Sequence, residues 1–200
     1  MFKPRMAVWI SFVSLFSLLF CAPSFAAQVL YTVDPNHTYV EWRINHLGFS
    51  HPSGKWYVNG TVMFDQEKLE NSRAEITIPV AAMVTGLPEL DKHLRSKEFF
   101  STEQFPQATF ISNKVTVKNN KISELGGILT LRGIAKPVSL TVKENKIGLN
   151  PITEQQTIGF SGEAKIKRSD FGMTAFLPAL GDEVSLIIEL EASPPKKLAE

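Results

Sequence analysis

Residues 157–173 read TIGFSGEAKIKRSDFGM, and this stretch decides the fold. From Ile158 to Ile166, apolar or small residues alternate with polar ones, which is the period of a β-strand with one dry face. Two positions on the dry face are Gly162 and Ala164, where a sheet that packs on another layer normally carries larger side chains. The pattern favours a strand whose small inward residues leave room for something else.

The segment directly after this strand, Arg168 to Met173, combines opposite charges with an aromatic ring, a glycine and a thioether. Glycine accepts a positive φ, and methionine adapts to irregular apolar surroundings. We interpret the segment as a rim between a polar mouth and an apolar interior.

The first 26 residues have the pattern of a secretory signal peptide. Two basic residues precede an unbroken apolar run from Met6 to Ala22, and a small-residue cleavage site follows. We predict cleavage between Ala26 and Ala27, with residues 27–192 forming one domain and residues 193–200 a loose tail. An uncleaved anchor and a lipoprotein processed at Cys21 are the alternatives.

Charge and cysteine content exclude several classes of function. The 200-residue chain has 21 basic and 20 acidic residues, and loss of the leader removes two basic ones, leaving a net charge of −1. A chain with this charge balance lacks the positive electrostatic potential that attracts nucleic acid. Cys21, the one cysteine, would leave with the leader, so we expect no disulfide, thiol nucleophile or thiolate metal ligand.

Most of the remaining chain alternates as strands do. Val40, Trp42, Ile44 and His46 fall on one line, and residues 55–65 keep one parity as a single strand bent at Gly60. Further strands are predicted at 29–33, 74–78, 107–112, 114–118, 127–132, 138–143 and 184–191, with a turn at Asn119-Asn120.

One helix is predicted, from Pro88 toward Phe100. Leu87, Leu90 and Leu94 share one of its faces, and proline suits its first turn. A single short amphipathic helix in an all-β chain is best used as a plug or lid. Eight to ten antiparallel strands form either a closed barrel or a sandwich, and about eight strands enclose a filled interior or one elongated ligand.

Several motifs, in order along the chain, resemble the YceI-like family over essentially all of the mature sequence. They are Asp34-Pro35-Asn36-His37-Thr38, the strand from Trp42 to His46, Asp91-Lys92-His93-Leu94, Phe99-Phe100, Phe105-Pro106 with Phe110 and Ser112, residues 127–133, Lys136-Pro137-Val138 and Arg168–Met173. The resemblance implies an all-β, lipocalin-like antiparallel barrel of about eight strands with one short helix covering it. It also implies a periplasmic location, often a homodimer, and binding of a polyisoprenoid or a similar lipid without catalysis.

Two positions depart from the family pattern. Thr38 stands where serine is usual, and Gly54-Lys55-Trp56 stands where Gly-x-Phe is usual. An inward Trp56 would narrow the cavity.

We predict that the protein carries an isoprenoid such as a quinone or prenyl phosphate, or a fatty-acid-like lipid, with no covalent cofactor and with a transient inner-membrane partner. Burial of a long apolar chain provides the driving force. The predicted apolar sleeve is Trp42, Ile44, Trp56, Val58, Phe110, Phe160, Gly162, Phe171, Met173 and Phe176. The predicted polar rim is His46, Asp91, His93, Arg168 and Asp170. Plain core packing and a bracing Arg168–Asp170 pair are the competing interpretations.

Signals for catalysis are weak. Residues 159–163 begin like a nucleophile elbow, but Glu163 replaces the second glycine and the pattern is that of a strand. The four histidines show no metal-binding spacing. The alternatives to a lipid carrier are a filled barrel that acts as an interaction module, in stress response or beside a membrane cytochrome, and a hydrolase or metal enzyme using His46 or His93.

Overall fold

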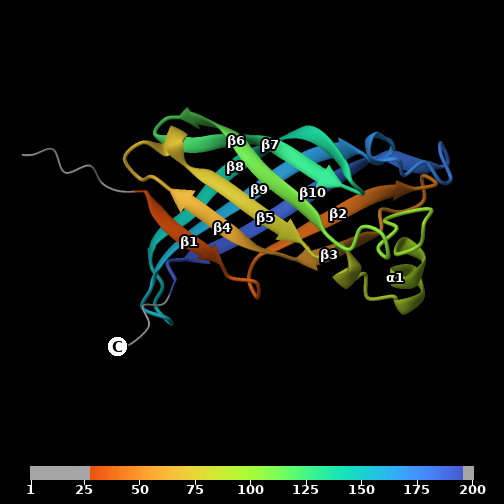
Figure 1. The fold of residues 1–200 in the computed structure, drawn as a ribbon, viewed down its shortest axis with the longest axis horizontal. Coiled ribbons are helices and arrows are strands. Elements are labelled where there is room, and N and C mark those ends of the chain that lie inside the picture. The colour runs from red at the N-terminus through yellow and green to blue at the C-terminus, as the bar shows by residue number, and fades with distance from the viewer. Residues whose placement is uncertain (1–27, 196–200) are drawn as a thin grey trace, which may run out of the picture.

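Ten antiparallel strands and one α-helix make up the computed structural model, which describes residues 28–195 (Figure 1). The strands are β1 Val29–Val33, β2 Tyr39–His46, β3 Ser53–Tyr57, β4 Asn59–Phe64, β5 Arg73–Ile78, β6 Ala108–Lys118, β7 Lys121–Leu131, β8 Ile134–Leu149, β9 Gln156–Lys167 and β10 Leu180–Ser193. The helix is α1 Pro88–Leu94, and the 3-10 turns are η1 Leu69–Asn71, η2 Val80–Ala82 and η3 Arg168–Phe171. The predicted signal peptide and residues 196–200 of the predicted tail lie outside the described residues.

The sheet closes on itself. Strand β10 pairs with β9 on one side and with both β2 and β1 on the other, while β2 pairs with β3 and β1 pairs with β4. Strands β1 and β2 are therefore two parts of one interrupted strand, and so are β3 and β4. The result is an up-and-down barrel of eight strands, counting β1 with β2 and β3 with β4 as one strand each. This confirms the predicted lipocalin-like barrel with one helix and rules out the sandwich.

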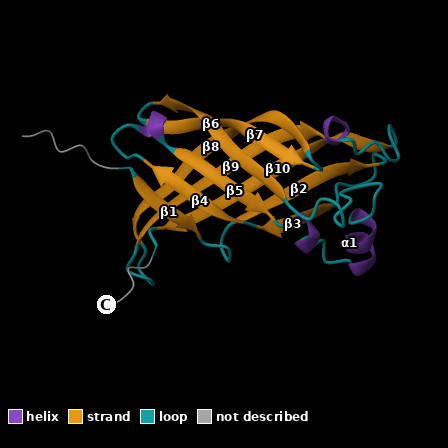
Figure 2. Ribbon diagram, in the orientation of Figure 1, coloured by secondary structure: helices purple, strands orange, loops and turns teal. Residues whose placement is uncertain are grey.

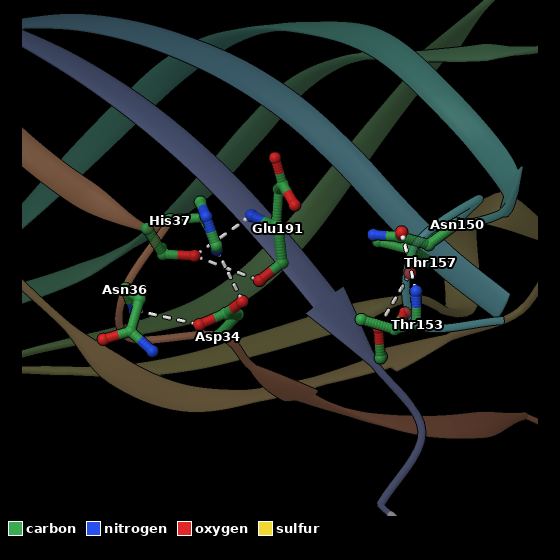
Figure 3. A network of polar contacts seen from close by, with 9 residues as sticks. Asp34, Asn36, His37, Asn150, Thr153, Thr157 and Glu191 are labelled. Carbon is green, nitrogen blue, oxygen red and sulfur yellow. Dashed lines mark hydrogen bonds and ion pairs between the residues drawn. The ribbon is translucent and has the colours of Figure 1, made fainter. Parts of the chain in front are cut away.

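The motif at residues 34–38 makes the interruption between β1 and β2. One carboxylate oxygen of Asp34 accepts a bond from the Asn36 N–H (2.9 Å), and the other contacts His37 Nδ1 (2.7 Å) (Figure 3). The buried Thr38 hydroxyl donates to the Glu191 carbonyl and accepts from the Glu191 N–H, both at 3.0 Å. These bonds attach the turn to β10. Thr38 supplies the same hydroxyl group as the serine that is usual at this position.

The break between β3 and β4 falls at Val58, whose N–H donates to the Thr38 carbonyl (3.2 Å). The predicted single strand at residues 55–65 is thus divided two residues before the expected bend. Gly60 still lies where no side chain fits, because a Cβ there would overlap the Glu75 carbonyl oxygen.

Other predicted boundaries shift for identifiable reasons. The strands predicted at 107–112 and 114–118 form one strand, β6, with a register shift between Ser112 and Lys114. The Asn119-Asn120 turn follows, with φ of 52° and 57°. Strand β10 continues to Ser193, which pairs with Thr32, one residue into the segment predicted as tail. The helix ends at Leu94, short of Phe100.

The interior is divided between two hydrophobic clusters. At the end that holds the 149–156 turn, Tyr31, Phe64, Ile158 and Phe160 fill the barrel, and the Phe64 and Phe160 rings lie 6.1 Å apart. The other cluster lines the end where α1, η2 and η3 lie (Figure 2). Side chains close the first end and leave the second end hollow.

Candidate ligand-binding cavity

A cavity of about 410 Å³ occupies the α1 end of the barrel. Strands β2, β3, β7 and β10 supply much of its wall through Trp42, Trp56, Leu131 and Leu186. These positions follow from strand alternation, which directs every second side chain inward. The volume lies in the range of small-molecule sites, and nearly all of the lining side chains are apolar.

Two tryptophans give one wall its shape. Trp56 donates its indole N–H to the Val80 carbonyl (3.1 Å) and meets the Phe100 ring edge-on at 5.3 Å. The Trp42 indole lies against Gly54, where a Cβ would come within 2.7 Å of the ring. Gly54 is therefore required by the Trp42 ring, and Trp56 faces inward as its place in the strand pattern predicts.

Helix α1 covers this end of the barrel, and Leu90, His93 and Leu94 line the cavity. The loop before the helix is fixed by Asp91, whose carboxylate accepts bonds from the Thr85 N–H (2.9 Å) and the Thr85 hydroxyl (2.6 Å). Asp91 thus positions the helix and does not line the cavity, contrary to its predicted place on the polar rim.

Aromatic rings meet at the mouth of the cavity. The His93 ring lies 5.0 Å from Phe99, edge-on, and Phe99 stacks on Phe176 at 6.2 Å. Phe176 has a φ of 60°, which is unusual for a bulky residue, and remains 57% exposed. His46 also lies at the mouth, so two histidines face this opening.

Arg168 lines the cavity, but its guanidinium is hydrogen-bonded to backbone carbonyls. It is 3% exposed and donates to the carbonyls of Gly181 (2.7 Å), Met173 (2.9 Å) and Leu180 (3.1 Å). Burial lowers the pKa of its guanidinium, and the charge of Asp182 acts in the opposite direction. Arg168 therefore ties η3 to the start of β10.

The acidic residue that fixes this turn is Asp182 and not the predicted Asp170. Asp182 accepts bonds from the Ser169 N–H (2.9 Å) and the Ser169 hydroxyl (2.8 Å). Burial opposes the charging of Asp182, but these two bonds and then the charge of Arg168 bring its pKa below the ordinary value. Asp170 is exposed and makes no ion pair with Arg168 among the described residues, so Asp182 and not Asp170 supplies the acidic charge that acts on Arg168.

The structure brings together eight of the fifteen predicted site residues around the cavity: Trp42, Ile44, His46, Trp56, His93, Arg168, Met173 and Phe176. Val58, Phe110 and Phe171 are buried in the surrounding core without lining the cavity. Phe160 packs in the filled end. Gly162 does not line the cavity, and a Cβ there would make ordinary van der Waals contact with the Ile188 side chain, 3.5 Å away.

Several lining residues were not predicted, among them Leu129, Leu131, Val184 and Leu186. Their strand parity is visible in the sequence, because Val184 and Leu186 share one line in the predicted strand at 184–191. Parity alone assigns a residue to the interior and does not show whether that level of the barrel is hollow or filled.

The weak catalytic signals have structural explanations. Residues 159–163 lie within β9, and Ser161 donates to Glu189 (2.7 Å) while accepting from Asn145 (2.7 Å). Across residues 28–195, no three His, Cys, Asp or Glu side chains are grouped so that they could hold a metal ion. Within the same residues, no helix has the length and hydrophobicity to cross a membrane.

A closed antiparallel barrel with an apolar cavity under a short helix defines the class of lipocalin-like barrels. A model of the YceI-like domain matches residues 31–192. Protein YceI of Salmonella arizonae is 38% identical over 186 residues, covering 92% of this chain and 96% of that protein, and Protein YceI of Salmonella paratyphi B matches equally. The chain therefore belongs to the YceI-like family.

Solved structures share the fold. The YCEI protein of Campylobacter jejuni is 29% identical with a TM-score of 0.67, over 76% of this chain and 90% of that one. BcnA of Burkholderia cenocepacia is 26% identical with a TM-score of 0.67, over 80% and 98% of the chains. A polyisoprenoid-binding domain from Saccharophagus degradans is 13% identical, with a TM-score of 0.64 over 84% and 99%, and shows likeness of fold alone.

Proposed function

We propose that the protein binds the apolar chain of an isoprenoid or similar lipid inside the barrel and carries it without covalent chemistry. The observation that supports this function most strongly is the apolar cavity of about 410 Å³, bounded by strands and covered by α1. Apolar chains gain free energy on leaving water for such a site. The fold that the chain shares with a polyisoprenoid-binding domain is consistent with this function.

The cavity volume limits how much of a chain can enter. At roughly 30 Å³ per carbon-sized group, 410 Å³ holds about fourteen groups, close to three isoprene units. Burial of that many groups provides roughly 11 kcal/mol before the costs of association and ordering. A longer chain would extend out through the mouth, because the opposite end is filled.

The polar end of the ligand belongs at the mouth. His46 and His93 are exposed there, whereas the deeper wall is apolar. Arg168 has given three of its five N–H groups to backbone carbonyls, so it contributes positive charge to the site with few free donors. The two histidines are therefore the first candidates to contact a quinone carbonyl or a phosphate.

Export to the periplasm and assembly as a homodimer belong to the same proposal. The first rests on the charged and apolar pattern of residues 1–26, and the second on the family resemblance. Cell fractionation tests the location, and sedimentation of the purified protein tests the dimer.

Native mass spectrometry tests the function directly. The protein would be purified from cells without detergent, and any bound molecule extracted and identified. We expect a stoichiometric adduct of several hundred daltons that extracts as an isoprenoid or acyl chain. A bare mass, unchanged after incubation with quinones, prenyl phosphates and fatty acids, would contradict the proposal and favour the interaction module.

A further inference from the structure

Large apolar side chains are exposed around the mouth of the cavity. Phe49 is 90% exposed, Leu87 62%, Phe176 57% and Leu47 49%. They come from three separate segments: the loop between β2 and β3, the residue before α1, and the loop between η3 and β10, all at the right-hand end of Figure 1. We call these four residues the apolar rim. Large exposed apolar patches on a protein surface mark interaction sites.

The turn that carries Phe49 is held in one shape. The Gly48 N–H donates to the Asn45 side chain (2.9 Å), the Phe49 N–H donates to the His46 carbonyl (3.0 Å), and the His46 N–H donates to the Ser50 carbonyl (2.9 Å). The phenyl ring is therefore presented to solvent by a bonded hairpin. A side chain held outward in advance loses little ordering entropy when it enters a partner.

The rim is continuous with the cavity, because Leu47 and Phe176 are both exposed outside and part of the cavity lining. A stable dimer buries a broad face of about 800 Å² on each partner, whereas these four side chains surround an opening, which disfavours a second copy as the occupant. A bilayer needs no complementary shape and accepts separate aromatic and aliphatic insertions at its surface.

We propose that the apolar rim docks the barrel on a lipid bilayer, with the cavity mouth facing the membrane. Phe49 and Leu87 enter the boundary between headgroups and acyl chains, and ligand passes between bilayer and cavity without crossing water. Residues 88–98, which follow Leu87, carry three acidic and three basic side chains, so apolar burial and not net charge drives the association. The docking surface is argued independently, and only its role in loading and releasing ligand rests on the proposed function.

Vesicle flotation tests this docking surface. The chain from Ala27 onward is used, because all ten strands and α1 lie within residues 28–195 and the apolar run before them would itself enter lipid. Vesicles of phosphatidylcholine alone are compared with vesicles of phosphatidylethanolamine and phosphatidylglycerol. We expect partitioning into both, with little change on adding salt, and a loss of about tenfold for Phe49→Ser and for Leu87→Ser.

Ile152 provides the matched control. It is 89% exposed in the turn between β8 and β9, at the opposite end of the barrel. Ile152→Ser should partition like the unaltered protein. Equal partitioning of Phe49→Ser and Ile152→Ser would overturn the proposal, as would binding that is abolished by salt or absent for the unaltered protein.

Two further measurements separate docking from ligand binding. Phe49→Ser should bind a soluble short-chain prenyl alcohol with unchanged affinity, because Phe49 does not line the cavity. Failure of the unaltered protein to bind that alcohol would count against the proposed function and leave the vesicle result standing. Sedimentation that shows a dimer disrupted by Phe49→Ser, without vesicle binding, would assign the rim to a second copy.

Discussion

At the scale of single residues, Arg168 illustrates how a charged side chain in a cavity wall can be structural. Its three bonds to backbone carbonyls join η3 to the first residues of β10. We predict that Arg168→Ala lowers the free energy of unfolding by about 3 kcal/mol or more, because three carbonyls would lose their partner. Urea unfolding monitored by circular dichroism measures the loss.

Asp170 provides the comparison on the same turn. It is exposed two residues away, so Asp170→Ala should change stability by no more than about 0.5 kcal/mol. Equal destabilisation by the two variants would restore the Arg168–Asp170 pair that the sequence suggested, and it would contradict the anchoring of Arg168 by backbone carbonyls.

The Asp34–His37 pair gives stability a pH dependence. The hydrogen bond and then the charge of Asp34 raise the pKa of His37 above 6.5, and the same bond, before other causes, lowers the pKa of Asp34 below 3.8. A raised histidine pKa stabilises the fold fully below 6.5, and this contribution is lost as the pH rises through the folded-state value.

We therefore predict that the protein melts at a higher temperature than His37→Gln near pH 6 and that this difference shrinks toward pH 9. The effect should be small, because the pair is exposed. Differential scanning calorimetry across this range measures it. A difference that stays constant or grows with pH would show that the bond does not depend on the charge of His37.

At the scale of elements, β10 carries one wall of the cavity. Val184 points inward and lines it, while its neighbour Ser185 lies on the outer face, between Arg43 and Lys165. Val184→Trp should fill part of the cavity and weaken lipid binding about tenfold or more, whereas Ser185→Trp should bind normally.

Fluorescence titration with a prenyl alcohol can measure both variants, with circular dichroism as the check on folding. If a folded Val184→Trp variant binds as tightly as Ser185→Trp, the ligand occupies some other place than this cavity.

Strand alternation predicted the antiparallel strands and the inward direction of Trp42, Trp56 and Phe160. Helical spacing predicted the helix, and the family resemblance favoured a barrel over a sandwich. Alternation could not separate Trp42, which lines the cavity, from Phe160, which packs on Phe64 in the filled end. That difference depends on which side chains share one level of the barrel. The level is set by strand stagger, and alternation is the same at every level.

The partner of Arg168 was hidden for a related reason. Asp170 is its neighbour in sequence, whereas Asp182 and the carbonyls of Leu180 and Gly181 come from the start of β10, across the loop. A contact between segments that the fold brings together leaves no pattern in the local sequence. The buried hydroxyl of Thr38 is similar, since its partner Glu191 lies 153 residues away.

At the scale of the whole molecule, the barrel is closed by side chains at one end and hollow at the other. The filled end sets a floor, so the cavity has a fixed depth, and α1 with the apolar rim surrounds the mouth. A ligand longer than the cavity would thus keep part of its chain at the mouth. Binding, loading from a membrane and chain length are connected through this one opening.

The measurement that tests the central claim most directly is the affinity for a series of prenyl alcohols of increasing length. The chain from Ala27 onward retains two tryptophans, Trp42 and Trp56, and both line the cavity, so their fluorescence reports binding. We predict at least a tenfold gain in affinity for each isoprene unit up to about three units, then a plateau. Affinity independent of chain length, or gains continuing well beyond three units, would contradict a cavity with a filled floor.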